Sequence, residues 1–129
     1  MLPSRFQDSL AEGGYVTQGF DRNLWVLTSA AFEGVYQRVM SMNLTDPLAR
    51  QLHRMILGAA SQLELDSAGR MLIPQNLRAF AKLKEEAILV GQGDYFEVWA
   101  PELWLGQEVL LEDAEANVER FMGLSVATR

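Results

Sequence analysis

The sequence predicts an α+β protein built from two copies of one unit, and three observations carry that prediction. Residues 63–74 have the residue types of a strand, a four-residue turn and a second strand. Residues 2–6 and 26–32 recur with similar residue types at 73–77 and 98–104. Between the copies, apolar residues follow the spacing of amphipathic helices. We therefore expect two similar β-containing units joined by a helical hairpin, with a further helix at the C-terminal end.

The hairpin centred on Asp66-Ser67-Ala68-Gly69 has the strongest turn signal in the chain. Aspartate at the first turn position accepts backbone N–H bonds, and glycine at the fourth takes a positive φ at little steric cost. Arg70 follows directly, so the turn should hold its guanidinium near the hairpin tip. An alternative interpretation is that Arg70 and Asp66 form a surface ion pair that only closes the turn, since such pairs are common and weak.

The repeat fixes how the two units correspond. Leu2-Pro3-Ser4-Arg5-Phe6 aligns with residues 73–77 at a spacing of 71, and residues 26–32 align with 98–104 at a spacing of 72. Carried backwards, the alignment places the counterpart of residues 61–70 before Met1. The first unit is therefore expected to begin within its own hairpin, without an Asp-x-x-Gly-Arg element.

Local patterns predict the remaining elements in order. Residues 3–10 suit a short helix ending at Gly13-Gly14, and β-branched and aromatic runs at 15–17 and 24–27 predict a hairpin. Its counterpart in the second unit pairs residues 87–90 with 95–99, after a short helix over 74–81. A C-terminal helix begins at Pro101-Glu102 and carries Trp104, Glu108 and Leu111. Beyond Glu112 the polar sequence should fray or pack on a neighbour.

Two helices are expected between the units. Ser29 is a candidate N-cap for the first, and Asp46-Pro47 supplies an N-cap and a first helical residue for the second, which ends at Gly58. The apolar positions of the two helices are Phe32, Val35, Tyr36, Val39 and Met40, then Leu48, Leu52, Met55 and Ile56. Their opposite face is expected to be solvated and carries Arg38, Arg50, His53 and Arg54. The sequence is predicted to divide into a first unit with its helix (1–40), a linking helix (41–59), a second unit (60–105) and an acidic C-terminal tail (106–129).

Composition narrows the functional classes. The chain of 129 residues has no cysteine, which rules out disulfides and thiolate metal sites, and no apolar run long enough to span a membrane. We expect a soluble, cytoplasmic protein without cofactor, metal or small-molecule substrate. Most of the net charge of −6 lies C-terminal to Phe96, where the sequence has seven acidic residues and only two arginines. The remaining body is nearly neutral and can present a local basic face.

An enzyme is disfavoured. Acid and base catalysis needs titratable groups with separated pKa values in one pocket, whereas Glu64 and Asp66 lie toward an exposed hairpin tip. His53, the only histidine, has no nucleophile at a recognisable spacing. Gly91-Gln92-Gly93 falls in a hairpin rather than opening a helix, so it is not a phosphate-binding loop.

These segments together resemble a known family. The second unit matches at 66–74, 77–78, 90–91 and 96–99, and the first unit matches at 2–6, 19–22, 24–26 and 44–47. They resemble MraZ, a family of bacterial transcriptional regulators encoded beside cell-division and cell-wall genes. The resemblance covers about residues 2 to 105. It implies two AbrB-like (SpoVT-AbrB type) swapped-hairpin units that form a pseudo-two-fold β-barrel, with several chains closing into a ring.

The resemblance also implies a function. The family binds short direct repeats in double-stranded DNA upstream of its own operon, usually as a repressor, through loops carrying Asp-x-x-Gly-Arg. In this sequence that element falls on Asp66, Gly69 and Arg70. Arg78, Lys82 and Lys84 are candidate phosphate contacts on chemical grounds, and the alternative interpretation is that they only make the surface soluble. The expected location is the cytoplasm, associated with the nucleoid. The alternative left open is an oligomeric interaction protein of the same fold that has lost DNA binding.

Overall fold

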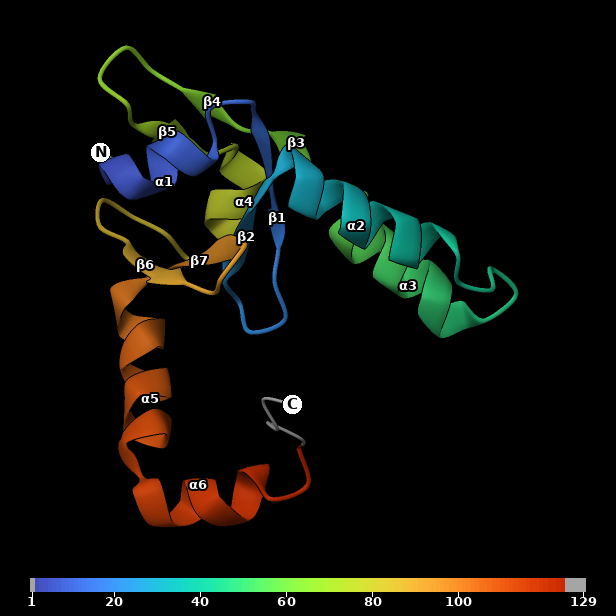
Figure 1. Ribbon diagram of the computed structural model, residues 1–129, viewed down its shortest axis with the longest axis vertical. Helices are drawn as coiled ribbons and strands as arrows, with labels where there is room; N and C mark the ends of the chain where they lie inside the picture. The colour runs from blue at the N-terminus through green and yellow to red at the C-terminus, as the bar shows by residue number, and fades with distance from the viewer. Residues whose placement is uncertain (1, 125–129) are drawn as a thin grey trace.

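A central antiparallel sheet carries two helical projections in this protein (Figure 1). The computed structural model describes residues 2–124. The helices are α1 (Ser4–Ser9), α2 (Ser29–Met40), α3 (Pro47–Ile56), α4 (Gln75–Phe80), α5 (Pro101–Glu112) and α6 (Ala114–Phe121). The strands are β1 (Gly14–Gln18), β2 (Leu24–Thr28), β3 (Ser61–Gln62), β4 (Glu64–Leu65), β5 (Met71–Leu72), β6 (Ile88–Gly91) and β7 (Tyr95–Trp99). The α+β class is confirmed.

The strand pairing reproduces the internal repeat. The five-stranded sheet has the order β3-β1-β2-β7-β6, and the two equivalent hairpins meet through β2 and β7. The repeat makes Leu24 equivalent to Phe96 and Val26 equivalent to Val98. Leu24 pairs with Val98 and Val26 pairs with Phe96, so exchanging the units leaves this register unchanged. The central ladder therefore obeys a local two-fold axis at the pair of Trp25 and Glu97.

The core lies where the two units meet. Strands β1, β2 and β7 contribute apolar side chains to this core, and the segments that contain α1 and α4 cover it from the two units. Its members are Leu2, Leu10, Val16, Leu24, Val26, Leu77, Ala81, Phe96 and Val98. Pro3 and Pro74 precede α1 and α4 with the same backbone angles, φ −56° and ψ 147°. The core draws its side chains from both units, so the interlocked pair folds around one shared core.

Helices α2 and α3 form a hairpin that projects from the sheet beside β1 and β2 (Figure 1). The expected Ser29 cap is wrong, because Thr28 one residue earlier accepts the Ala31 N–H at 3.1 Å. Asp46 caps α3 as predicted, accepting the Leu48 N–H at 2.9 Å. The buried Thr17 hydroxyl donates to the carbonyl of Ile56 and anchors the C-terminal end of α3 to the sheet.

Several side chains on this helical hairpin do not lie where the spacing placed them, and two of these, Tyr36 and Met40 of α2, were expected on the apolar face but are 38% and 48% exposed. Leu48 was expected on the apolar face but is 71% exposed, whereas Ala49 is buried. His53 was expected on the solvated face but is half-buried, and its Nε2 lies 2.8 Å from the Val39 carbonyl of the neighbouring helix. The apolar stripe of α3 is rotated toward Ala49 and Ile56, because α3 packs against both α2 and β1.

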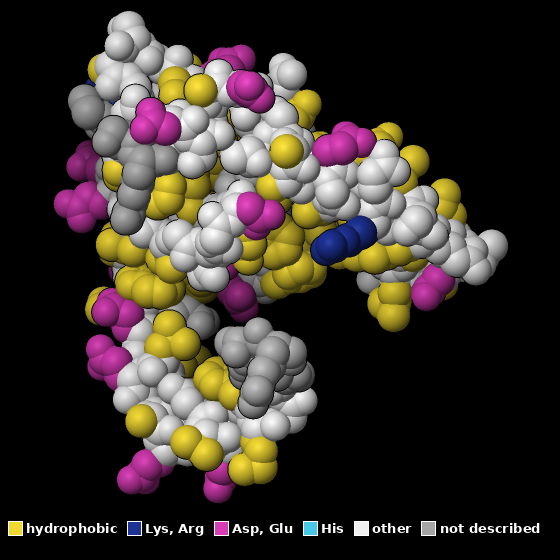
Figure 2. Space-filling model, in the orientation of Figure 1, with side chains coloured by type: hydrophobic (Ala, Val, Ile, Leu, Met, Phe, Trp, Pro, Cys, Tyr) yellow, Lys and Arg dark blue, Asp and Glu magenta, His cyan; other side chains and the backbone are white. Residues whose placement is uncertain are grey.

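The C-terminal helices run away from the sheet as a bent arm, predominantly apolar and acidic (Figures 1 and 2). Helix α5 starts at Pro101 as predicted, and a break at Asp113 starts α6, whose Ala116 N–H is capped by the Asp113 carboxylate. Neither helix contains a buried residue. Exposed apolar side chains on this arm are Leu105, Val109, Leu110, Leu111, Val118, Phe121, Met122 and Leu124.

The sheet does not close on itself. Hairpin β4–β5 forms a separate two-stranded ladder, and the described residues 2–124 contain no pairing that joins it to the larger sheet as a closed barrel. The closed barrel implied by the family resemblance is therefore not found within this part of the chain. No helix in the same range is long and apolar enough to cross a bilayer.

Candidate functional site

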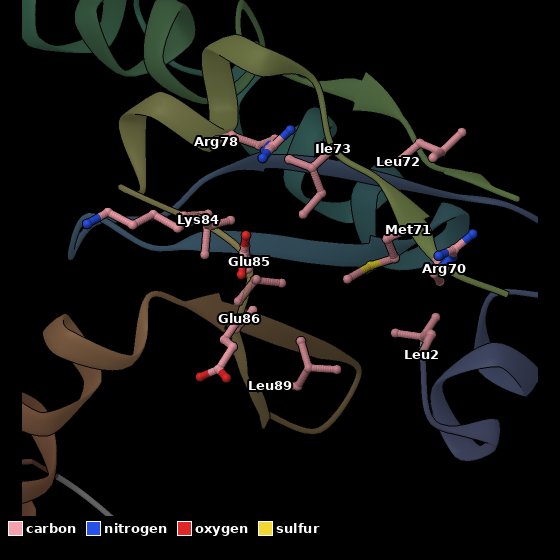
Figure 3. A pocket seen from close by; sticks show the side chains of 13 residues that line it. Leu2, Arg70, Met71, Leu72, Ile73, Arg78, Lys84, Glu85, Glu86 and Leu89 are labelled. Carbon is pink, nitrogen blue, oxygen red and sulfur yellow. The ribbon is translucent and has the colours of Figure 1, made fainter. Parts of the chain in front are cut away.

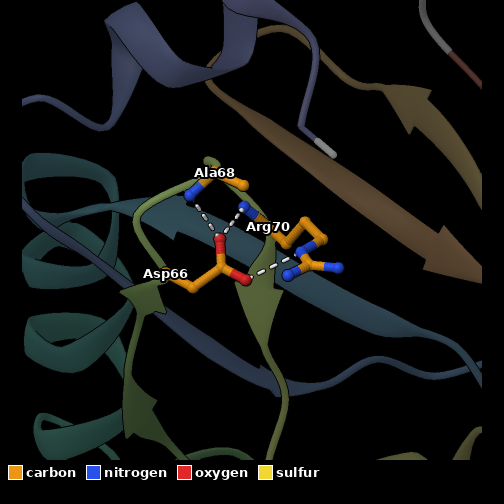
Figure 4. Close-up of polar contacts among 3 residues, drawn as sticks. All are labelled: Asp66, Ala68 and Arg70. Atoms are coloured by element: carbon orange, nitrogen blue, oxygen red, sulfur yellow. Dashed lines mark hydrogen bonds and ion pairs between the residues drawn. The ribbon is translucent and has the colours of Figure 1, made fainter.

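The predicted hairpin is present, and Asp66 organises its tip (Figure 4). The Gly69 N–H donates to the Asp66 carbonyl at 3.0 Å, and the Asp66 N–H donates to the Arg70 carbonyl at 2.9 Å. One carboxylate oxygen of Asp66 accepts the backbone N–H groups of Ala68 and Arg70, each at 2.9 Å. The other accepts Nε–H of Arg70 at 2.7 Å. A single carboxylate thus fixes both the turn and the arginine.

Electrostatics and backbone geometry favour this arrangement. The backbone N–H of Arg70, together with its side chain and the Ala68 N–H, lowers the pKa of Asp66 below its usual 3.8, so the carboxylate is ionised at neutral pH. Gly69 adopts φ +81°, as predicted for the fourth turn position, and a Cβ there would lie 3.1 Å from the Gln7 side chain. The turn geometry therefore requires glycine at this position.

Arg70 keeps its two terminal amino groups available. Its side chain is 66% exposed although Nε is bonded, and no hydrogen bond to either Nη group occurs within residues 2–124. A guanidinium held through Nε points its two Nη groups outward in a fixed plane. That end can engage a phosphate, or the O6 and N7 acceptors of guanine. The structure thus combines both interpretations of the sequence, since the ion pair closes the turn and also orients the arginine.

The other three basic candidates lie on a different segment of the chain from the hairpin. Arg78 lies on α4, and Lys82 and Lys84 lie in the connection between α4 and β6; all three are exposed. Arg70 and Lys84 lie at opposite ends of the groove drawn in Figure 3. The structure therefore brings Asp66, Gly69 and Arg70 together at the hairpin tip, and Arg78 and Lys84 line the same groove as Arg70 from a different segment.

Lys82 occupies an unusual backbone conformation. Helix α4 ends in a Schellman motif, in which the Leu83 N–H donates to the Arg78 carbonyl at 2.9 Å and the Lys82 N–H to the Ala79 carbonyl at 3.2 Å. Lys82 takes the left-handed position of that motif, with φ +57°. Glycine is the usual residue there, because a Cβ adds strain.

Replacing Lys82 by glycine is therefore expected to stabilise the fold by about 1 kcal/mol. Chemical denaturation of the purified variant would measure the change. Lys84→Gly is the matched control: it removes the same charge from the same connection but no positive φ, so it should be neutral or destabilising. A Lys82→Gly variant less stable than the parent would contradict this account of the strain.

Arg22 is a residue that the sequence patterns did not single out. It lies in the β1–β2 turn with φ +59°, and its Nη1 donates to the Phe80 carbonyl at 3.4 Å. The guanidinium carbon also lies 5.1 Å from the centre of the Phe80 ring. These contacts place the Arg22 guanidinium against the C-terminal end of α4. Phe80, which it contacts, precedes Lys82 by two residues. Only tertiary packing brings the two segments together, since 58 residues separate the bonded pair.

Comparison with known proteins assigns the chain to a family. A family described as "MraZ protein, putative antitoxin-like" matches residues 56–122. A protein of Roseiflexus castenholzii named transcriptional regulator MraZ is 39% identical over 120 residues, covering 93% of this chain and 82% of that protein. Proteins with the same name from Thermomicrobium roseum and Hydrogenovibrio crunogenus are 39% and 40% identical, covering 85% and 80% of this chain and 78% and 71% of their own.

The chain belongs to the MraZ family. The match to the MraZ family spans the whole Asp66–Arg70 element, α4 and the second unit's β-hairpin. The resemblance noted from the sequence is thereby confirmed, and the similarity to the Roseiflexus protein extends over most of the first unit as well.

Proposed function

We propose that this MraZ-family chain is a sequence-specific, DNA-binding transcriptional regulator, acting as a repressor on promoter repeats of its own cell-division and cell-wall operon. Its relatives are named transcriptional regulators. The observation that carries the proposal is the geometry of Arg70, whose Nε is held by Asp66 at 2.7 Å while its outer end is exposed. Asp66 acts by orienting the arginine, since a carboxylate in contact with DNA would be repelled by phosphate.

Arg70 and the three basic residues on the α4 segment are suited to different kinds of contact with DNA. Arg70, in a fixed plane at a hairpin tip, suits bidentate readout of guanine, which contributes about 1 to 3 kcal/mol of discrimination. Arg78, Lys82 and Lys84 are exposed and lie on a separate segment, where flexible side chains suit phosphate contacts that carry no sequence information. Gly69 supports the turn that presents Arg70.

Assembly compensates for the small contact made by one chain. A single hairpin makes few DNA contacts, whereas several linked chains on repeated sites bind more tightly through effective concentration. We propose that copies associate into a ring through the arm formed by α5 and α6, whose exposed apolar residues include Leu105 at 62% and Val109 at 69%. A concentration of exposed apolar side chains is a common mark of an interface between chains. The acidic side chains between these residues (Figure 2) would lie away from DNA in such a ring.

Several finer features belong to the same proposal. Residues 1–40 and 60–105 would act as two AbrB-like swapped-hairpin units related by a pseudo-two-fold axis, joined by residues 41–59 and followed by residues 106–129. The two-fold register of β2 and β7 supports this division. The regulator would work in the cytoplasm, associated with the nucleoid. No enzymatic role is proposed, and the described part of the chain brings together no group of three metal-binding side chains.

Salt-dependent gel shift with the promoter fragment tests the proposal. Phosphate contacts release counterions, so affinity should fall steeply as salt rises, by about 10³ to 10⁵ between 50 and 200 mM for six to ten contacts. A fragment with scrambled repeats is the control and should bind far more weakly.

The net charge of −6 and the apolar arm favour the second candidate, an oligomeric interaction protein without DNA binding. That candidate predicts no shift at any salt concentration.

A further inference from the structure

The two units differ at one pair of equivalent places, where the short helix of one unit meets the β-hairpin turn of the other. At the end of α4 this junction is closed by Arg22 and Phe80. The Arg22 Nη1 donates to the Phe80 carbonyl at 3.4 Å, and the guanidinium carbon lies 5.1 Å from the centre of the Phe80 ring. A guanidinium in this position is attracted by the negative face of the ring.

The repeat identifies the counterparts of these two residues at the other junction. The segment of α1 aligns with that of α4 at a spacing of 71, so Ser9 is the counterpart of Phe80. Strand β2 aligns with β7 at a spacing of 72, so Asp94 is the counterpart of Arg22. The ring and the cation of one junction are thus replaced by a hydroxyl and a carboxylate at the other.

The hydrogen bonds of the two turns support this correspondence. In the β1–β2 turn the Gly19 N–H donates to the Asn23 carbonyl at 2.9 Å, and in the β6–β7 turn the Gln92 N–H donates to the Tyr95 carbonyl at 2.9 Å. The two acceptors are equivalent by the spacing of 72, so the residues just before them are equivalent as well. The β6–β7 turn is one residue shorter, since four residues rather than five lie between the last paired residues of its strands.

A cavity of about 290 Å³ lies at this second junction, and Ser9 and Asp94 are among the residues that line it. Phe6 and Phe96 form part of its wall, with ring centres 4.4 Å apart. Serine leaves the space that a phenylalanine ring would fill, and the shorter turn adds to it. The residues of both junctions lie within 6–28 and 80–96.

Asp94 gives the cavity a negative charge. It is the one charged residue among the described residues that line the cavity, and it forms no ion pair with the described side chains of residues 2–124. Burial raises the pKa of the neighbouring Tyr95, and the charges of Glu97 and Asp94 raise it further. A negative potential therefore extends over the turn. Aromatic walls beside a carboxylate suit an organic cation.

We infer that this cavity is a binding site for a small aromatic cation. Its flat ring lies against Phe6 and Phe96, and an amidinium or guanidinium group attached to the ring pairs with Asp94. The first unit thereby gains from a ligand the ring and the guanidinium that the second unit supplies from its own chain. The volume is at the small end of the range for ligand pockets. This site goes beyond DNA recognition and does not depend on it.

Titration of the full chain with phenylguanidine, followed by saturation-transfer difference NMR, tests the inference. Saturable binding of the protonated compound is expected. Phenylurea is the matched control compound, because it has nearly the same shape but no charge. It should bind about tenfold more weakly, since it lacks the charge-assisted hydrogen bond to Asp94.

Three variants locate the site. Asp94→Asn keeps the shape of the turn and should bind the two compounds equally weakly. Ser9→Phe introduces the ring that the second unit has at this position, so it should fill the cavity and exclude both compounds. Glu86→Gln is the charge-matched control: it removes one carboxylate from the groove of Figure 3 and should bind phenylguanidine like the parent.

Three results would overturn the inference: no saturable binding to the parent, equal affinity of the parent for phenylguanidine and phenylurea, or weaker binding in Glu86→Gln with Asp94→Asn unchanged. Should Ser9→Phe fail to fold, Asp94→Asn and the control compound still decide the question. DNA is absent from the experiment, so its failure would leave the proposed regulator untouched.

Discussion

Replacing Arg70 by alanine is expected to abolish the promoter gel shift while leaving the fold and the assembly intact. An exposed ion pair such as the one between Arg70 and Asp66 contributes little to stability, so thermal unfolding should change little. Each lost bidentate contact removes about 1 to 3 kcal/mol of discrimination. In an assembly that uses several hairpins at once, these losses accumulate.

Two further variants sharpen this test. Arg70→Lys keeps the charge but loses the planar fork, so it should retain salt-dependent binding and lose preference for the promoter repeats. Arg54→Ala removes an exposed arginine from α3, outside the proposed interface, and should bind DNA like the parent. Unchanged promoter affinity in Arg70→Ala would show that the hairpin does not contact DNA.

Introducing a charge on the C-terminal arm is expected to dissociate the assembly. Val109→Glu places a carboxylate on a side chain that is 69% exposed on α5 in the single chain. Burial of an unpaired charge in an interface is strongly unfavourable, so light scattering coupled to size exclusion should report a smaller particle. Apparent affinity for repeated DNA sites should fall by about 10² to 10⁴ as multivalency is lost.

A charge-matched control separates assembly from electrostatics. Gln51→Glu adds the same charge at an exposed position of α3 and should leave particle size unchanged. Affinity for a single repeat should be similar in both variants. If Val109→Glu keeps the parent's mass, the apolar surface of α5 does not hold the copies together.

Local sequence signals predicted the elements that depend on neighbouring residues. The turn at Asp66 to Gly69, the Asp46-Pro47 helix start and the Pro101 helix start are present where turn and capping chemistry placed them. The internal repeat also predicted that the two hairpins are equivalent, as the sheet registers show. Each of these features is decided within a few residues or by direct comparison of two segments.

Features that depend on contacts between distant segments were mispredicted or missed. Helical spacing placed Leu48 on the buried face and His53 in solvent, because it defines a stripe but not how α2 and β1 meet that stripe. The contact of Arg22 with Phe80 and the left-handed conformation of Lys82 carried no local signal.

The sequence by itself determined that this chain is a repeated α+β protein of the MraZ family, with one arginine presented by an Asp-x-x-Gly turn. Turn and capping energies act over a few residues, so they can be inferred without a fold. Only the tertiary structure decided that Asp66 holds Arg70 through Nε and that Arg78 and Lys84, from a different segment, line the same groove as Arg70. Those outcomes follow from packing two units around a shared core, where the position of each side chain is set by segments far away in the chain.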